Sequence, residues 1–384
     1  MIKIVPALPQ DLPPTDIIFQ TPFWGEFKHK VNKEKSLYFW VGYTKDFCES
    51  EPSFGSMKIF SLLVQIRKTK SNTVYAYTPR SPAINIAENE RGFILEEIAF
   101  CIKDFLPKET LFIRFDIPWA VPGAFSSDKR IELSQLAMNF GTKHHNLYKA
   151  QSNHLCPNTV IMDLRPSPEK LLSMMRQQTR NSIRRSYKEG VEFEIYDKSS
   201  PLIMQKLEEW HKIYKQTAER KGFYYEEFEY FKILFEMLCQ NNVKNERRFD
   251  DKNIVPLDAT APLPEFYLFT ASKENKILSG LILAICGSSA YYMYAASSLE
   301  NRQCMPNYGL QWEVIRFARS KGCTKYDLMG IPPSDDKTNS MAGLFIFKTG
   351  FGGQKVHFGG TWDFPYNKEE YHAFSSAESL QLRP

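Results

Sequence analysis

The chain has 384 residues, of which 43% are hydrophobic and 24% are charged, and its formal net charge at pH 7 is +5. This composition is typical of a globular protein with two domains, and the seven cysteines, which form no CxxC pair or Cys/His cluster, argue against a disulfide framework or a zinc site. No apolar run is long enough for a membrane span or a signal-peptide core, so we expect a cytoplasmic protein.

The first half of the chain predicts a short helix, several strands and a longer helix. Residues 20–30 (QTPFWGEFKHK) are expected to form the short helix, with Thr21 as its N-cap and Pro22 at its first position. Aromatic and branched residues predict strands at 37–43, 57–67, 73–77 and 111–117, and helical spacing predicts a helix at 92–106. Residues 118–158 are less regular and are expected to link the two halves.

The second half opens with a strand at 160–164 and a basic helix. Ser167, Pro168 and Glu169 are strong helix-start residues, and one helix is expected to continue from there to about Lys188. Basic residues recur along it at spacing four: Arg176, Arg180, Arg184 and Lys188. A ridge of basic residues beside an apolar stripe is the pattern expected of a helix that binds RNA phosphates. A helix face that is simply exposed to solvent would show the same pattern.

Further elements follow in the same alternating manner. Two helices are expected at 201–217 and 226–240, and the polar, Pro-rich segment 241–265 reads as an exposed loop. The sequence then predicts strands at 266–271, 276–286, 290–297, 325–329 and 362–366, with a helix at 308–321. The last residues of the chain are expected to be frayed.

The stretch 341–353 (MAGLFIFKTGFGG) places one lysine, Lys348, at the end of an apolar run that reads as a buried strand or a short helix. Gly350, Gly352 and Gly353 then allow a sharp turn or a close approach of the backbone to a ligand. A lysine in a poorly hydrated site can stabilise a developing oxyanion. The alternative is a lysine that extends from a strand end into solvent.

The two halves share an order of elements that indicates a duplicated α/β unit. Each half has a Tyr-rich strand, a turn with an arginine, a helix and a strand ending near an aspartate. The markers are Tyr77, Arg80 and Asp116 in the first half, and Tyr294, Arg302 and Asp327 in the second.

These segments together resemble the FemABX family of aminoacyl-tRNA-dependent peptidyltransferases, which build the interpeptide bridge of peptidoglycan. In the second half the resemblance rests on residues 175–190 (MRQQTRNSIRRSYKEG), 217–223 (TAERKGF), 294–298, Arg302, 307–312 (NYGLQW), 326–330 (YDLMG) and 343–352. In the first half it rests on Gln20, Trp24 and Lys28, on residues 77–82 (YTPRSP), and weakly on 114–118.

The resemblance implies an α/β (α+β) fold with two tandem domains like those of the GCN5-related N-acetyltransferases (GNAT-like). Domain 1 is then expected at residues 1–155 and domain 2 at 156–360, the latter carrying the basic helix 168–188 and the lysine loop. The tail at about 361–384 is expected to pack back on domain 1. Some members carry a coiled-coil arm in domain 2, whereas the short segment 241–265 suggests that this chain has none.

The implied reaction moves an amino acid from aminoacyl-tRNA to an amine on the stem peptide of a peptidoglycan precursor, either lipid II or UDP-MurNAc-pentapeptide. Because the ester is already activated, no cofactor, metal or enzyme nucleophile is expected. A lipid-linked acceptor would add a peripheral contact with the inner membrane face.

The resemblance also gives candidate site residues. Lys348 is assigned to oxyanion stabilisation with Phe347 beside it, and Asp116 either orients the amine or caps its strand structurally. The acceptor-binding candidates are Lys28, Trp24, Arg302, Tyr77, Tyr294 and Tyr308. The tRNA-binding candidates are Arg176, Arg180, Arg184 and Arg185.

One departure from the family stands out, and two alternatives stay open. Many members have an arginine where this chain has Glu226, and a tyrosine that matches Tyr230; both are thought to help hold the acceptor's diphosphate. A carboxylate cannot bind phosphate as an arginine does. The alternatives are an acyl-CoA-dependent N-acyltransferase of the same fold, which the missing Gly-rich pyrophosphate turn disfavours, and a non-catalytic tRNA- or muropeptide-binding protein.

Overall fold

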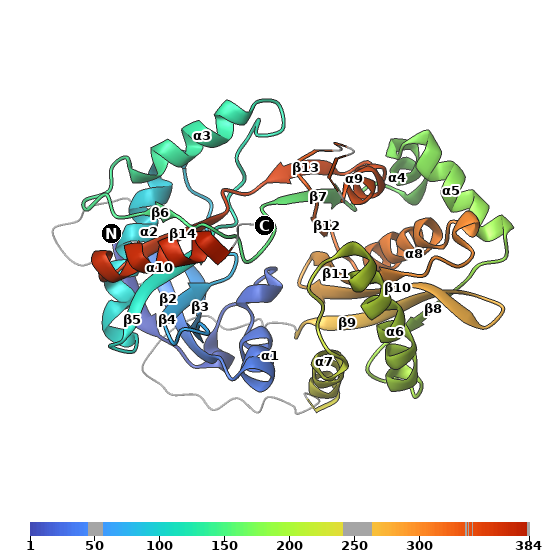
Figure 1. The fold of residues 1–384 in the computed structure, drawn as a ribbon, viewed down its shortest axis with the longest axis horizontal. Helices are drawn as coiled ribbons and strands as arrows, with labels where there is room; N and C mark the ends of the chain where they lie inside the picture. Colours follow the sequence, from blue (N-terminus) through green and yellow to red (C-terminus); the bar gives the residue numbers. More distant parts are fainter. Residues whose placement is uncertain (45–56, 241–262, 335, 337, 340, 382–384) are drawn as a thin grey trace. The chain divides into compact units, whose positions relative to one another are not determined.

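The computed structural model describes all residues except 45–56, 241–262, 335, 337, 340 and 382–384. The described residues fall into two compact units. Unit 1 comprises residues 1–157 and 356–381, and unit 2 comprises residues 158–240 and 263–355. Each unit is built on one seven-stranded sheet, so the protein is of the mixed α/β class (Figure 1).

The sheet of unit 1 has the strand order β1-β2-β3-β4-β5-β14-β6. Its strands are β1 (Ile2–Pro6), β2 (Lys35–Tyr43), β3 (Lys58–Lys68), β4 (Val74–Thr78), β5 (Thr110–Asp116), β14 (Thr361–Pro365) and β6 (Tyr148–Lys149). Neighbours are antiparallel except for β4 and β5, which are parallel. The C-terminal strand β14 therefore lies between two strands from the first half of the chain.

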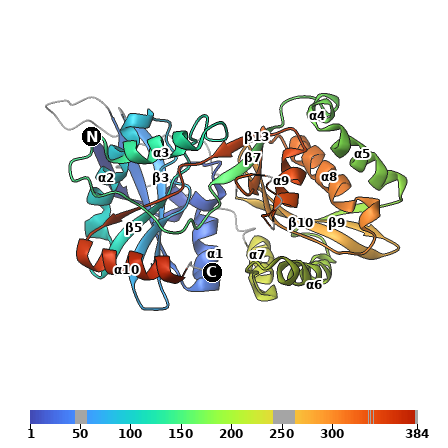
Figure 2. The same cartoon turned by 45° about the horizontal axis from the view of Figure 1, so that its top comes forward.

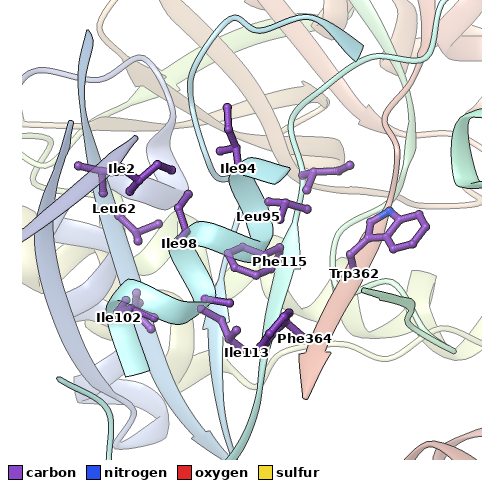
Figure 3. Close-up of a cluster of buried hydrophobic side chains, with 14 of the residues drawn as sticks. Ile2, Leu62, Ile94, Leu95, Ile98, Ile102, Ile113, Phe115, Trp362 and Phe364 are labelled. Carbon is purple, nitrogen blue, oxygen red and sulfur yellow. The ribbon is translucent and has the colours of Figure 1, made fainter. Parts of the chain in front are cut away.

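Helices cover both faces of the unit 1 sheet. They are α1 (Pro22–Asn32), α2 (Arg91–Ile102), α3 (Asp128–Leu136) and α10 (Lys368–Gln381). The apolar side of α2 packs with Phe115, Trp362 and Phe364 in the main core, which Figure 3 shows. On the other face α10 packs through Tyr371 against Tyr75, Tyr77 and Phe112. The predicted start of α1 is confirmed, because the Thr21 hydroxyl accepts the N–H of Trp24 at 3.2 Å.

Unit 2 repeats the scheme of unit 1. Its strand order is β13-β7-β12-β11-β10-β9-β8. These strands are β7 (Asn158–Asp163), β8 (Glu192–Tyr196), β9 (Glu265–Lys273), β10 (Lys276–Cys286), β11 (Ser289–Ser297), β12 (Lys325–Gly330) and β13 (Gln354–His357). In both units three antiparallel strands are followed by a helix and then by a strand parallel to the third, which confirms the predicted duplication.

The helices of unit 2 are α4 (Pro168–Met174), α5 (Gln177–Lys188), α6 (Ile203–Lys221), α7 (Phe228–Gln240), α8 (Pro306–Ser320) and α9 (Ala342–Thr349). Phe317 of α8 packs on Tyr267 and Phe269, whereas Trp210 of α6 contacts Gly280 on the opposite face of the sheet. Helices α6 and α7 lie side by side in both views (Figures 1 and 2). Short 3₁₀ turns complete the structure at 9–11, 18–20, 88–90, 103–105, 137–139 and 302–304.

Three expectations about local structure need correction or fall outside the described residues. The single helix at 168–188 is wrong: Met175 and Arg176 are extended and divide it into α4 and α5, because the Arg176 N–H donates to the Gly350 carbonyl at 2.9 Å. The frayed tail is wrong as well, since residues 368–381 form α10. Most of the predicted loop 241–265 lies outside the described residues, and the residues that the structure describes contain no coiled-coil arm.

Candidate functional site

Lys348 lies in the last turn of α9 and is 3% exposed. Its ammonium donates to the carbonyl of Gly330 at 2.9 Å and lies 3.5 Å from that of Met329. It also lies 4.4 Å from the centre of the Tyr292 ring. Two carbonyl dipoles and an aromatic face thus hold one positive charge away from bulk water, where an ammonium acts most strongly on a neighbouring developing anion.

The end of β12 is shaped to present these carbonyls. Its pairing with β7 shifts register between Asp327 and Gly330, and Met329 adopts a φ of 55°, which is rare for a residue with a side chain. The Asp327 carboxylate accepts the Met329 N–H at 2.8 Å and the hydroxyl of Thr159. These contacts hold the irregular strand end in place.

The glycines after Lys348 serve close packing within the chain. A Cβ on Gly350 would lie 2.4 Å from the Thr179 hydroxyl, and one on Gly352 would lie 2.6 Å from the Met174 carbonyl. Gly352 also has a φ of 85°, which favours glycine. The glycines thus let the end of α9 pack closely against a side chain of α5 and the backbone of α4.

Aromatic rings lie beside α9, the helix that carries Lys348 (here called the lysine helix). Phe347 packs edge-on against Tyr308 at 5.0 Å and against Phe351 at 5.2 Å. Tyr308 and Phe351 lie 6.0 Å apart with nearly parallel rings. Phe347 and Tyr308 remain half-buried, and burial raises the pKa of the Tyr308 hydroxyl. The structure therefore brings Lys348, Phe347 and Tyr308 together in unit 2.

The basic side chains are carried by α5, which begins next to the end of α9. Thr179, Ser182, Ile183 and Ser186 form its buried side, while Arg176, Arg184 and Arg185 are exposed and Arg180 is half-buried. Arg180 donates to the Met175 carbonyl, Arg184 donates to Asn181 at 3.3 Å, and Arg185 lies 3.7 Å from Glu189. The Arg176 backbone bond to Gly350 joins the start of α5 to the end of the lysine helix.

Tyr294 and Arg302 lie in other parts of unit 2. The Tyr294 hydroxyl is hydrogen-bonded to that of Tyr230 at 2.7 Å, and its ring meets the edge of Phe231 at 5.0 Å. Arg302 is exposed in the 3₁₀ turn before α8.

In unit 1 the structure brings Asp116 and Tyr77 together. Asp116 is fully buried at the end of β5, where it accepts the Tyr77 hydroxyl at 3.2 Å and the Leu155 N–H at 3.0 Å. The Arg80 guanidinium lies 3.7 Å from its other oxygen. Burial raises the pKa of Asp116, an effect that Arg80 opposes. These contacts tie β4, β5 and the segment around residue 155 together.

Lys28 and Trp24 share one side of α1. The Lys28 ammonium lies 5.3 Å from the centre of the Trp24 ring and 5.8 Å from that of Phe27. Trp24 is buried and meets the edge of Phe19 at 5.1 Å. The cation thus rests on an aromatic surface, as its spacing of four residues from Trp24 predicts.

Sequence reasoning did not assign a role to Tyr292 or to the carbonyl of Gly330, which contact Lys348, or to Thr159, which donates to Asp327. Asp327 appeared there as a repeat marker and as part of the YDLMG motif, without a role of its own. The YDLMG segment carried the available signal, because a glycine within a strand pattern often marks a bulge or an irregular strand end.

Among the described residues there is no group of three or more His, Cys, Asp or Glu side chains placed to hold a metal ion. Nor does that part of the chain contain a helix with the length and apolar character needed to cross a membrane.

Comparisons with known proteins agree with the fold and the motifs. Residues 14–245 and 240–379 match the model of the FemAB family. Lipid II:glycine glycyltransferases of Staphylococcus epidermidis and Staphylococcus aureus are each 25% identical to the chain; the first alignment covers 64% of this chain and 67% of its relative, and the second 64% and 68%.

A crystal structure of FemX is similar over 96% of both chains, with a TM-score of 0.66 and 18% sequence identity. The predicted α/β class with two tandem domains is confirmed by the two sheets, and the fold is shared with FemX. The matches span both units, and the chain therefore belongs to the FemAB family.

Proposed function

We propose that this protein is an aminoacyltransferase that moves an amino acid from aminoacyl-tRNA to an amine on the stem peptide of a peptidoglycan precursor, either lipid II or UDP-MurNAc-pentapeptide. The observation that carries the proposal is the buried ammonium of Lys348, clamped by the Met329 and Gly330 carbonyls. The names of the relatives, lipid II:glycine glycyltransferases, support the acceptor class.

In the proposed reaction the neutral amine of the acceptor attacks the ester carbonyl. A C–N bond forms, the carbonyl oxygen becomes an oxyanion, and the C–O bond to the tRNA ribose then breaks. The proton lost by the amine ends on the leaving hydroxyl, so no external acid or base is consumed. Lys348 stabilises the oxyanion by donating a hydrogen bond to it in place of its longer contact with the Met329 carbonyl. One such donor contributes about 3–4 kcal/mol of transition-state stabilisation.

Asp116 is proposed as a structural residue of unit 1. Its side chain is fully enclosed and engaged with Tyr77, Leu155 and Arg80, so proton transfer to or from a substrate would require these contacts to open. Its elevated pKa follows from that same enclosure. The Tyr77 hydroxyl is engaged by Asp116, which supports a structural role for Tyr77 as well.

The donor tRNA is proposed to bind along α5. Arg176, Arg180, Arg184 and Arg185 lie on its exposed or half-exposed side, and the helix begins next to the turn that follows Lys348. Backbone phosphates bind arginine ridges of this kind through salt-sensitive contacts. Lys28 on unit 1 and Arg302 on unit 2 remain proposed cations for phosphates of the acceptor.

A lipid-linked acceptor would require the protein to work at a membrane surface, and α3 supports such a peripheral contact. Leu133, Leu136 and Phe140 are 58%, 70% and 67% exposed within eight residues. Side chains of this size bind the interface of a bilayer by inserting their apolar ends. Replacing all three by serine should abolish sedimentation with phospholipid vesicles, and unchanged sedimentation would contradict the contact.

The function is tested by incubating the purified protein with mixed charged tRNAs and with lipid-linked or nucleotide-linked precursors, followed by mass spectrometry of the precursor. The expected product is heavier by one amino-acid residue and appears only when charged tRNA is present. Acyl transfer from acyl-CoA in place of charged tRNA, or binding without any product, would contradict the proposal.

A further inference from the structure

Strand β11 carries one extra residue, Met293, in its pairing with β10. Tyr292 lies opposite Leu283, and Tyr294 lies opposite the neighbouring residue of β10, Ile282, so Met293 is added between them. Such a β-bulge re-aims the side chains on either side of it. Because side chains alternate between the two faces of a regular strand, residues 292 and 294 would otherwise share a face. With the bulge between them they point to opposite faces of the sheet.

The contacts of the two tyrosines agree with this arrangement. On one face of the sheet the Tyr294 ring meets Phe231 of α7, with the ring centres 5.0 Å apart. On the other face the centre of the Tyr292 ring lies 4.4 Å from the ammonium of Lys348, which is carried by α9. Helix α9 packs on α8 through Phe347, and α8 covers the face opposite to α6. The bulge thus turns one ring toward the lysine and leaves the other with α7.

The attraction between this ring and the ammonium does not depend on the hydroxyl group. Burial raises the pKa of Tyr292, so its phenol is neutral at physiological pH and forms no ion pair with the lysine. The ring attracts the ammonium through its electron-rich face, as the ring of a phenylalanine would. Lys348 is 3% exposed, and this attraction is strongest where water is excluded.

We propose that Tyr292 is a positioning residue for Lys348, and that the bulge at Met293 aims its ring there. The Gly330 carbonyl accepts one N–H of the ammonium, whereas a ring face attracts the charge without fixing the direction of each N–H. Lys348 can therefore exchange its longer contact with the Met329 carbonyl for a bond to a substrate oxygen while the ring keeps the ammonium in place. The consequence for turnover rests on the proposed function, in which that oxygen is the oxyanion.

The contact is tested by NMR on the full chain labelled with ¹³C at the lysine ε carbons. Protons above the face of an aromatic ring are shifted upfield, and the Lys348 signal is assigned by its absence from Lys348→Met. We expect this signal upfield in the wild type and in Tyr292→Phe, which keeps the ring. It should move downfield in two variants without a ring, Tyr292→Leu and Tyr292→Met. The control Tyr291→Leu removes the neighbouring ring, which points to the opposite face, and should leave the signal in place.

Steady-state kinetics of aminoacyl transfer test the positioning itself. Tyr292→Leu should lower kcat by roughly 10- to 100-fold with little change in KM, because the displaced ammonium no longer meets the transition state correctly. Tyr292→Phe should keep nearly all of the activity. On a Lys348→Met background, adding Tyr292→Leu should cause no further loss, since the ring acts through the lysine. Thermal unfolding of each variant verifies that the fold is retained.

An unchanged Lys348 signal in both variants without a ring would overturn the proposal. Equal losses of kcat in Tyr292→Phe and Tyr292→Leu would overturn it too, and so would a further loss on the Lys348→Met background. If the wild type transferred no amino acid, the proposed function would fail, and the NMR signals would still decide whether the ring holds the lysine. Transfer that does not respond to Tyr292→Leu would leave the function standing and refute the positioning role.

Discussion

The carboxylate of Asp327 accepts the backbone N–H of Met329 at 2.8 Å, and this bond sets the strand end whose carbonyls contact Lys348. Met329 has a φ of 55°. For a residue other than glycine this conformation costs about 1–3 kcal/mol of free energy, which contacts with the surrounding structure must offset. Asp327 thus influences the lysine through the backbone of the intervening residues.

Replacing Asp327 by alanine should therefore disturb the Lys348 site. The Met329 N–H loses its acceptor, and we expect the free energy of unfolding to fall by about 1–3 kcal/mol and turnover to fall by roughly 10- to 100-fold. Asp327→Asn keeps an oxygen acceptor and should retain most of both. Chemical denaturation and steady-state kinetics measure the two effects, and equal behaviour of the two variants would contradict this role.

Replacing Lys348 by methionine should lower turnover by about 10²- to 10³-fold, because the proposed oxyanion loses its positive partner. The unbranched methionine side chain fills similar space, so the fold should persist by circular dichroism. Lys355→Met removes an exposed lysine seven residues further on and should leave turnover unchanged. Near-normal turnover of Lys348→Met would refute the assignment.

The C-terminal segment should prove necessary for the stability of unit 1. The Arg114 guanidinium is buried and makes two 2.8 Å bonds to Asp363 of β14, and Glu378 of α10 accepts two more at 2.9 Å. Asp363→Ala leaves this guanidinium without its main partner and should lower the free energy of unfolding by about 3–5 kcal/mol.

A matched control for this ion pair is Asp163→Ala, which breaks the exposed pair with Arg165. Urea denaturation should show little change for this variant, since solvent screens exposed charges. If both aspartate variants lost equal stability, the buried network would not be the cause.

Removing charge from α5 should weaken tRNA binding in a salt-dependent manner. Arg176→Gln with Arg184→Gln removes two exposed cations, and the slope of log affinity against log salt should fall by roughly one per lost phosphate contact. The control pair Lys212→Gln with Arg316→Gln makes the same change of net charge on α6 and α8. Filter binding at several salt concentrations separates the two; identical slopes would argue against α5 as the tRNA surface.

Local patterns predicted the elements whose signals are contained within a few residues. Thr21 and Pro22 marked the start of α1, and the aromatic and branched runs marked most long strands. Lys348 was singled out as a candidate because a lone charge after an apolar run is conspicuous, and its catalytic role stays a prediction. The same reasoning missed β1, β8 and α3, which are short.

Features decided by distant residues escaped prediction. The break between α4 and α5 depends on the carbonyl of Gly350, which lies far away in sequence. Helix α10 looked frayed because its sequence is polar, yet Tyr371 is buried and donates to Asp363. The contacts of Lys348 depend on the backbone of Met329, which no side-chain pattern encodes.

The position of β14 has a consequence for how the chain is made. Unit 1 receives Trp362, Asp363 and Phe364 only after all of unit 2 has been synthesised, because β14 follows it in the sequence. During translation unit 1 lacks Asp363, the partner of Arg114, and part of its core until β14 has been made. Unit 2 can therefore complete its fold before unit 1 does. A ribosome that stalls before residue 361 would therefore release a chain whose leading half is the unfinished one.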